Sequence, residues 1–317
     1  MSANTNTKKA DRTLMIDICQ RFYLEEQSKT EIADALGLSR FKVARLIASA
    51  RSQGLVQIRI GDDSPATPLG RELKQAYGLE FAEVADGPFP TERGLWDGLG
   101  RTAAFLLERV LTDRDILGIS WGRSIQAILP HLTRLPQCPV VQLSAMTGGP
   151  ENNSTEVVRR FAKISNGMAY PLYAPLVLPN TVTTQGLLQE AGIAETFARH
   201  SQVTVAVMSI GSWVPPNSQL RLQFQMSEVE RLTKRGVVAE IGRGMLNEAG
   251  ELIDDPATDR ILAISPDRLR RIPTVIAVAG GAAKALAIDS VLTSRLINSL
   301  VTDEGTARAL IRKAESR

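Results

Sequence analysis

The segment from residue 28 to residue 60 constrains the fold more than any other part of the chain. Ser28 and Glu31 stand three residues apart, which is the spacing of a capping box at the start of a helix. Gly37 can end that helix, and Ser39 can cap a second one. The chain is therefore expected to form two short helices joined by a tight turn.

Apolar residues recur in both expected helices at the spacing of one buried face. They are Ile32, Ala35 and Leu36 in the first helix and Val43, Leu46, Ile47 and Ala50 in the second. The opposite face of the second helix carries cationic side chains near its N-terminal end, where a recognition helix contacts base edges in the major groove. With a supporting helix over 14–26 and a short apolar strand ending at residue 60, the pattern predicts a winged-helix-like helix-turn-helix. The residues expected to contact DNA are Lys29, Thr30, Ser39, Arg40, Phe41, Lys42, Arg45 and Arg51.

The distribution of charge supports this interpretation better than the net charge of +3 does. Residues 1–60 contain ten Lys and Arg against six Asp and Glu, whereas residues 61–317 contain 27 against 28. Between Ser39 and Gly61 there are five basic residues and no acidic one, which suits a surface that faces phosphates. The alternative is that these charges form only a solvated helix face. The capping box, the glycine turn and the apolar spacing together favour DNA binding.

The length of 317 residues and the hydrophobic content of 44% suggest one large domain and one small one. We expect a disordered tail over 1–11, a DNA-binding domain over 12–60 and a linker over 61–68, where Gly, Pro, Ser and Asp gather. The larger domain then spans 69–317. No apolar run approaches the ~20 residues of a membrane span and no signal peptide is recognisable, so a cytoplasmic protein is expected.

Cysteine and histidine usage argues against metal chemistry. Cys19 and Cys138 are far apart in apolar surroundings, which favours buried thiols over a disulfide or a metal pair. The two histidines, His131 and His200, do not stand at ligand spacing from any cysteine. The sequence therefore predicts neither a metal site nor a cofactor.

Short apolar strands alternate with helical stretches in the larger domain. Helices are expected near 95–110, 154–166, 227–235 and 283–294, and strands over 81–86, 116–120, 140–146, 169–177, 203–211 and 274–281. Several strands are apolar throughout, as strands covered on both faces must be. The pattern predicts an α/β domain with a mostly parallel sheet, in which ligands bind beyond the carboxyl ends of the strands.

Four of these strands end in small and polar residues. ILGIS leads into WGRS, VVQLSAM into TGG, VTVAVMSI into GS, and TVIAVA into GG followed by Lys284. Glycines let backbone N–H groups approach an anion, and serine and threonine add hydroxyl donors. Glycine in a single strand-to-helix turn can also serve the backbone alone. Because the pattern recurs at four strand ends, we expect a pocket for a polyol or a sugar phosphate there.

The chain also resembles the SorC-type family of sugar-binding transcriptional regulators. The resemblance runs from about residue 14 almost to the C-terminus and rests on the ordered motifs EIADALGLSRFKVARLIASARSQGLVQI, GISWGRSI, YAPLVLP, GVVAEIGRGMLNEAG, VIAVAGGAAKALAI and LVTDEGTARALI. It implies an effector domain of the same fold group as ribose-5-phosphate isomerase and glucosamine-6-phosphate deaminase. It also implies a homo-oligomer, commonly a tetramer, whose effector is a sugar, a sugar phosphate or a polyol.

The resemblance further implies where the effector binds. Arg123 and Lys284 could meet a phosphate and Glu240, which stands where relatives often have Asp, could accept from hydroxyl groups. Lys284 could instead be the exposed start of a helix. The full set of expected effector-binding residues is Ser120, Trp121, Gly122, Arg123, Ser124, Thr147, Gly148, Gly149, Gly211, Ser212, Glu240, Gly280, Gly281 and Lys284.

These observations predict a DNA-binding transcriptional regulator whose operator binding is modulated by the effector. One alternative is a sugar-phosphate isomerase or deaminase with an appended DNA-binding module. It would need a positioned base and acid, for which Glu240 and Asp303 are candidates, but no paired-carboxylate motif with a nearby lysine follows any of the four strands. Another alternative, a structural DNA-binding protein without a ligand, fits poorly with a large domain of nearly neutral charge.

Overall fold

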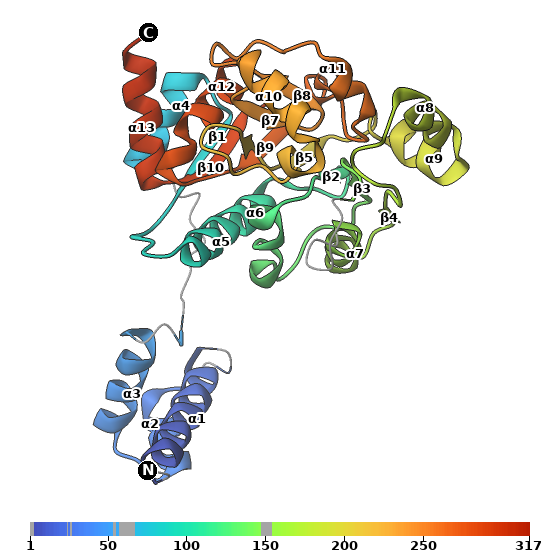
Figure 1. Ribbon diagram of the computed structural model, residues 1–317. Helices are drawn as coiled ribbons and strands as arrows, with labels where there is room; N and C mark the ends of the chain where they lie inside the picture. The colour runs from blue at the N-terminus through green and yellow to red at the C-terminus, as the bar shows by residue number, and fades with distance from the viewer. Residues whose placement is uncertain (1–2, 24, 26, 53–54, 57–66, 147–153) are drawn as a thin grey trace. The chain divides into compact units, whose positions relative to one another are not determined.

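The chain divides into two compact units, Met1–Ser64 and Pro65–Arg317, and each has its own hydrophobic core (Figure 1). The computed structural model describes residues 3–23, 25, 27–52, 55–56, 67–146 and 154–317. The boundary between the units falls inside the segment expected to be a linker, 61–68.

Three helices make up the described part of the N-terminal unit: α1 (Ala3–Tyr23), α2 (Lys29–Leu36) and α3 (Arg40–Ser52). The expectation of a disordered tail over 1–11 is wrong for residues 3–11, which belong to α1. This segment contains no Gly or Pro to stop a helix that is anchored further along by its packed end. The expected strand that ends at residue 60 falls mostly outside the described residues.

The connection between α2 and α3 forms as the sequence predicts. Ser28 Oγ accepts a hydrogen bond from the Glu31 amide at 3.2 Å, and the Ser28 amide donates to Glu31 Oε2 at 2.7 Å, which confirms the capping box. Gly37 ends α2 in the left-handed conformation with φ +63°. Ser39 Oγ then accepts from the Lys42 amide at 3.2 Å and caps α3. Local hydrogen bonds therefore define both helix ends at the turn.

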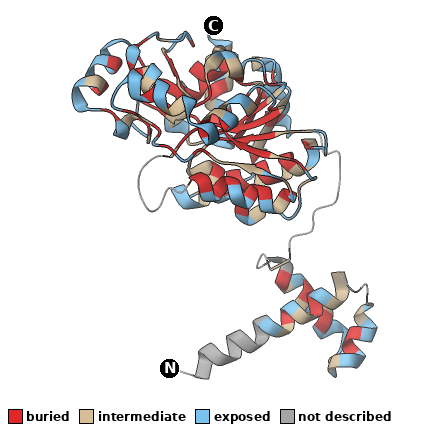
Figure 2. Cartoon of the chain, turned by 90° about the vertical axis from the view of Figure 1, so that its right-hand side faces the viewer, coloured by how far each residue is buried: buried red, intermediate tan, exposed pale blue. Residues whose placement is uncertain are grey.

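The core of the N-terminal unit confirms most of the predicted apolar face. Val43, Ile47 and Ala50 are buried, as is Cys19 of α1. The expectation for Ala35 is wrong, because the buried alanine of α2 is Ala33, which lies beside Ile32 on the side facing the other helices. Figure 2 shows the buried residues on the sides of the three helices that face one another.

A parallel sheet forms the centre of the large unit. Seven strands among the described residues pair in the order β1-β10-β9-β5-β2-β3-β4, and every pairing between them is parallel, so the predicted sheet is confirmed. The strands are β1 (Phe81–Ala85), β2 (Leu117–Ile119), β3 (Val140–Gln142), β4 (Ala169–Tyr170), β5 (Val205–Met208), β9 (Thr274–Val278) and β10 (Ser299–Asp303).

Two differences from the expected strands have local causes. β3 and β4 are shorter than expected, because past Gln142 and Tyr170 the chain continues in isolated bridges such as Ser144 with Ala263. β10 was not expected at all, since only two large apolar residues stand in SLVTD, although all five residues are buried.

The order of the strands creates a topological switch point between β2 and β5. From β2 the chain adds β3 and β4 on one side, whereas from β5 it adds β9 and β10 on the other. β2 and β5 themselves are neighbours, with Ile119 paired to Val207. Chains that leave two adjacent parallel strands in opposite directions open a crevice at the carboxyl edge of the sheet.

Helices cover both faces of this sheet (Figure 1). One core joins the sheet to α4 (Pro68–Tyr77), α12 (Ala285–Thr293) and α13 (Glu304–Glu315). The other joins it to α5 (Glu92–Val110), α6 (Arg123–Gln126) and α7 (Ser154–Ser165), and it includes the buried Cys138. Successive residues of β5 alternate between the two cores, as period-two side chains of a covered strand must.

Smaller elements extend the domain beyond the sheet. A three-stranded antiparallel sheet contains β6 (Gly211–Ser212), β7 (Ala239–Ile241) and β8 (Gly244–Leu246), and it shares a core with α10 (Met226–Lys234). A helical hairpin comprises α8 (Thr181–Gln189) and α9 (Ala191–Arg199), and α11 (Pro266–Leu269) precedes β9. Short 3-10 turns lie at Leu129–His131, Arg221–Gln223, Pro256–Arg260 and Ala282–Lys284.

His200 connects the end of α9 to the sheet. Its ring is 1% exposed, and Nε2 donates to the Gln142 carbonyl oxygen at 2.9 Å. Burial lowers the pKa of His200 from 6.5 to about 4. The folded protein therefore holds this imidazole neutral at pH values where the unfolded chain would protonate it.

Acid should destabilise the protein partly through His200. The unfolded state binds a proton below pH 6.5 and the folded state only near pH 4, so stability present above 6.5 is lost as the pH falls through this window. The loss should be about 3 kcal/mol between pH 7 and pH 4. Chemical denaturation at both pH values would measure it, and His200→Gln should be less sensitive to acid by this amount. Equal acid sensitivity of the two proteins would contradict the assignment to His200.

Replacing Gly37 with alanine should destabilise the turn by about 1 kcal/mol, because an L-residue is strained at φ +63°. No atom lies within 4 Å of the added Cβ, so conformational strain is the only cost. Gly37→Asn is the matched control, since asparagine tolerates this conformation better and should lose less. Hydrogen exchange of the α2 and α3 amides in the full chain would measure both effects. An equal loss in the two variants would refute the conformational cause.

Candidate functional site

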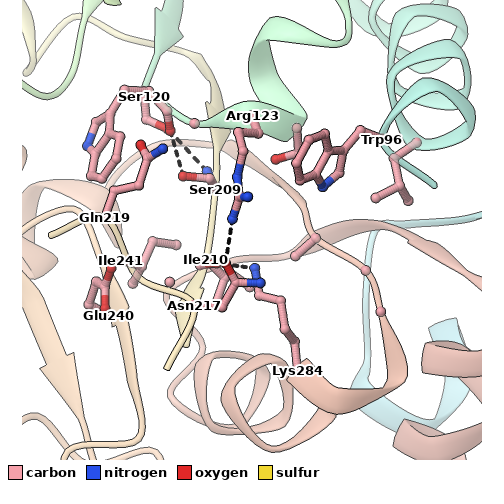
Figure 3. Close-up of a pocket in the computed structure, with 18 of the residues that line it drawn as sticks. Trp96, Ser120, Arg123, Ser209, Ile210, Asn217, Gln219, Glu240, Ile241 and Lys284 are labelled. Atoms are coloured by element: carbon pink, nitrogen blue, oxygen red, sulfur yellow. Dashed lines mark hydrogen bonds between the residues drawn. The ribbon is translucent and has the colours of Figure 1, made fainter. Parts of the chain in front are cut away.

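A pocket of about 240 Å³ lies at the carboxyl edge of the sheet, where β2, β5 and β9 end (Figure 3). Its position at the switch point is the place where α/β sheets bind ligands. Ten of the fourteen residues expected from the sequence line it: Ser120, Trp121, Gly122, Arg123, Ser124, Gly211, Glu240, Gly280, Gly281 and Lys284.

The other four residues expected to bind the effector are not found in the lining of the pocket, for two different reasons. Ser212 does not line the pocket: its side chain is buried and its hydroxyl donates to the Pro215 carbonyl oxygen at 2.8 Å. Side chains alternate along a strand, so Ser212 faces away where its neighbour Gly211 faces the pocket. Thr147, Gly148 and Gly149 lie outside the described residues.

Several pocket residues escaped the sequence analysis because they come from other elements. Helix α5 provides Glu92 and Trp96, and the segment after β6 provides Asn217 and Gln219. Their patterns are those of a packed helix and a polar loop, which gave no signal. Ser209 follows β5 directly and Ser144 stands two residues beyond the end of β3, and their polar character near a strand end could have identified them.

Two serines join the strands at the switch point. The Ser209 amide donates to Ser120 Oγ at 3.1 Å, and Ser209 Oγ donates to the Trp121 carbonyl oxygen at 2.6 Å (Figure 3). These hydrogen bonds fix the segments that follow β5 and β2 against each other. The floor of the pocket is therefore held by its own polar groups.

Arg123 is contacted by groups from three directions. Its guanidinium carbon lies 4.5 Å from the Trp96 ring centroid, in the geometry of a cation–π contact. An ion pair of 3.6 Å joins it to Glu92, and it donates a hydrogen bond to Asn217 Oδ1. Since the Arg123 side chain remains 38% exposed, it can exchange these partners for an anion at the mouth of the pocket.

Lys284 is half-buried and its side chain extends toward Ile210 (Figure 3). Its Nζ donates to the Ile210 carbonyl oxygen at 2.7 Å, so the interpretation of Lys284 as an exposed helix start is wrong. Burial and the charge of Arg123 lower the pKa of Lys284, while Glu240 opposes the shift. Two of the three ammonium protons remain for other acceptors.

Glu240 is 5% exposed and its carboxylate is bound from two sides. Trp213 Nε1 donates to Oε2 at 2.5 Å, and Ser218 Oγ donates to Oε1 at 2.6 Å. Gly211 is required beside it, because a Cβ there would lie 1.7 Å from Oε1. Burial raises the pKa of Glu240, and the two hydrogen bonds partly offset this shift. A carboxylate offers about four acceptor positions, so two remain.

Two buried polar atoms of the pocket have no hydrogen-bond partner among the described residues. They are Ser144 Oγ and Gln219 Oε1. Buried polar atoms are nearly always paired, so an unpaired one in a pocket indicates a missing partner. A hydroxyl group can donate to the amide oxygen and can donate to or accept from the serine. The unpaired atoms therefore match a ligand rich in hydroxyl groups.

Some expected donors are occupied by the protein itself. Asp303 Oδ1 accepts from the Gly281 amide at 2.6 Å, and Ser124 Oγ donates to the Val278 carbonyl oxygen at 2.7 Å. The Gly281 amide and the Ser124 hydroxyl proton are therefore engaged within the protein and are not free to donate to an anion. Asp303 also accepts from the amide and the hydroxyl of Thr306 as the cap of α13.

The two carboxylates that the enzyme alternative would need already accept hydrogen bonds within the protein. Asp303 caps a helix, and Glu240 accepts from Trp213 and Ser218. Neither is placed as an unengaged general base. The described residues contain no group of three or more His, Cys, Asp or Glu side chains that could hold a metal ion.

The residues expected to contact DNA are mostly exposed on the N-terminal unit. Thr30, Arg40, Phe41, Lys42 and Arg45 are all exposed. Two others are partly engaged: the Ser39 hydroxyl caps α3, and Lys29 Nζ lies 5.4 Å from the ring centroid of Phe22. The side chain of Arg51 lies outside the described residues.

A family model described as "Putative sugar-binding domain" matches residues 65–312. The chain therefore belongs to this sugar-binding family, within the SorC-type transcriptional regulators. It is 29% identical over 311 residues to the sorbitol operon regulator of Klebsiella pneumoniae, covering 95% of this chain and 98% of that protein. It is also 29% identical over 304 residues to the deoxyribonucleoside regulator of Bacillus subtilis, covering 94% and 97%.

The solved structures agree with this assignment. The full-length sorbitol operon regulator SorC from Klebsiella pneumoniae superposes with a TM-score of 0.81 at 27% identity, covering 95% of this chain and 99% of that one. The mixed α/β fold with a parallel sheet is thus that of sugar-binding regulators. Among the described residues, no helix has the length and apolar character needed to cross a membrane.

Removing one hydrogen bond from Glu240 should destabilise the large unit. Trp213→Phe keeps the ring but leaves a buried carboxylate oxygen without its donor, which should cost about 2 kcal/mol. Trp121→Phe is the matched control, because no hydrogen bond of the Trp121 indole occurs among the described residues. Chemical denaturation would measure both, and an equal effect of the two substitutions would contradict the role given to Trp213.

Proposed function

We propose that the pocket at the switch point binds the effector of this transcriptional regulator, a sugar, sugar phosphate or polyol. The observation that carries the proposal is the meeting of Arg123 and Lys284 with two unpaired buried atoms, Ser144 Oγ and Gln219 Oε1. The cations suit a phosphate, and the unpaired atoms suit hydroxyl groups. Glu240 keeps free acceptor positions for a further hydroxyl.

The names of relatives support this class of effector. They include a sorbitol operon regulator, a deoxyribonucleoside regulator and, from Brucella abortus at 29% identity over 95% of this chain, the erythritol catabolism regulatory protein EryD. A pocket of about 240 Å³ suits a compound built on one sugar unit better than a larger molecule. We also infer that the domain shares its fold group with ribose-5-phosphate isomerase and glucosamine-6-phosphate deaminase.

We infer further that α2 and α3 form a helix-turn-helix, with α3 in the major groove. The capping box, the turn at Gly37 and the exposed Arg40, Lys42 and Arg45 support this assignment. Such a unit works in pairs on a pseudo-palindromic operator, so a dimer or a tetramer is expected. Operator DNA also makes the cytoplasm the expected compartment.

Regulation requires that the effector bind one arrangement of the protein more tightly than another. Arg123 offers a means of coupling the effector to the arrangement of the protein, because an anionic effector would compete with Glu92 and Asn217 for its guanidinium. Glu92 and Trp96 both belong to α5, so this exchange would change what holds the first turns of that helix. We propose α5 as the element whose position reports an occupied pocket.

The effector and the role of Lys284 can be tested together. A thermal-shift screen of the full chain against free and phosphorylated sugars and polyols should find a compound that stabilises it by ~2–4 kcal/mol at concentrations well above its dissociation constant. Lys284→Ala should lose this stabilisation and keep operator binding. Lys234→Ala, which changes an exposed lysine at the end of α10, is the control and should respond as the parent does. No shift with any compound would overturn the sugar class of effector.

Arg40 should contribute to operator recognition. Arg40→Ala should weaken operator binding by ~1–3 kcal/mol and relax the preference at one base pair if the side chain contacts a base edge. Binding to the operator and to random DNA, each measured by fluorescence anisotropy at one salt concentration, would distinguish a contact with a base edge from a contact with a phosphate. An equal loss on both DNAs would assign Arg40 to a phosphate instead.

A further inference from the structure

Phe41 is the second residue of α3, and its side chain is 89% exposed. All eight phenylalanines of the chain lie among the described residues, and the other seven are buried or half-buried. An exposed phenylalanine forgoes the gain from removing a large apolar ring from water. A ring left in this position therefore indicates a surface that it covers in a complex.

The surroundings of Phe41 identify the kind of partner. Arg40, Lys42 and Arg45 are exposed, and none of them takes part in an ion pair among the described residues. No acidic residue occurs between Ser39 and Gly61. A protein partner that covered the ring would have to desolvate these cations, whereas a nucleic acid would neutralise them with phosphates. The aromatic ring thus lies in the middle of a surface that suits DNA.

Within the major groove, base pairs present polar edges with a single apolar group, the 5-methyl group of thymine. A phenyl ring cannot hydrogen-bond, so covering a polar base edge would leave that edge unpaired. Contact with the methyl group removes apolar surface of both partners from water instead. The base that suits Phe41 is thymine.

We propose that Phe41 contacts the 5-methyl group of a thymine in each operator half-site and so determines the base at that position. This inference rests on the proposed function, because it requires that α3 enter the major groove. The neighbouring cations then contribute hydrogen bonds and charge, while Phe41 contributes a preference based on shape and apolar contact. The specificity of α3 is thereby partly independent of salt.

The first experiment selects DNA from a random double-stranded pool with the full chain and with Phe41→Ala. The parent protein should enrich sites with thymine at one position in each half-site, and Phe41→Ala should lose the preference at that position alone. Leu222→Ala, which removes an exposed apolar side chain of the other unit, is the control and should enrich the parent's sites. Enrichment of no sequence by the parent would overturn the proposed DNA-binding function itself.

The second experiment removes the methyl group without changing the protein. Each thymine of the selected site is replaced in turn by deoxyuridine, which keeps all hydrogen-bonding groups. One replacement per half-site should weaken binding of the parent about fourfold, the effect of one buried methyl group, and should leave binding of Phe41→Ala unchanged. Phe41→Leu, which keeps an apolar side chain, should retain part of the effect.

The proposal is overturned if no deoxyuridine replacement weakens binding by the parent, or if one does so equally in Phe41→Ala. Both results leave the DNA-binding function intact, because specific binding to the selected site is their starting point. Since Phe41 has few contacts to lose, the variant should fold, and its helical circular dichroism would verify this. The deoxyuridine series on the parent protein tests the contact even without the variant.

Discussion

The pairing of β2 with β5 is the constraint on which the functional architecture depends. These strands are distant in sequence but neighbours in the sheet, and the chain departs from them in opposite directions, so a crevice opens at the carboxyl edge between them. The crevice that results is closed at its base by the hydrogen bonds of Ser209 with Ser120 and with the Trp121 carbonyl. Every charged group of the pocket is positioned relative to this junction, by the strand ends or by the elements packed against them.

The pKa values of the buried charged groups of the pocket depend on the residues around them. Burial raises the pKa of Glu240 and lowers that of Lys284, so desolvation favours the neutral form of each. Their mutual attraction, together with the donors Trp213 and Ser218, favours the charged forms instead. These partners oppose the effect of desolvation on the pKa of each group. A substitution at one of them therefore alters the other.

The sequence predicted the features that depend on local rules and missed those that depend on assembly. The capping box at Ser28 and the parallel sheet follow from spacing and from apolar runs, and both form as expected. β10 escaped because its burial comes from neighbouring strands and not from apolar composition. Ser212 was misassigned because the alternation of side chains turns it away from the pocket. Trp96 and Glu92 could not be found, since only the packing of α5 brings them to the strand ends.

Among the residues that the structure describes, four ionisable groups line the pocket, and they carry two positive and two negative charges when all are ionised: Arg123, Lys284, Glu92 and Glu240. Their fields cancel beyond a few ångströms, so the empty pocket exerts little long-range attraction on anions. Abundant phosphate-bearing metabolites are thus not accumulated at its mouth merely because they are negative. Under the proposed function, discrimination between phosphate compounds begins only at contact, when the effector displaces Glu92 from Arg123, so other phosphates in the cell would not trigger the response.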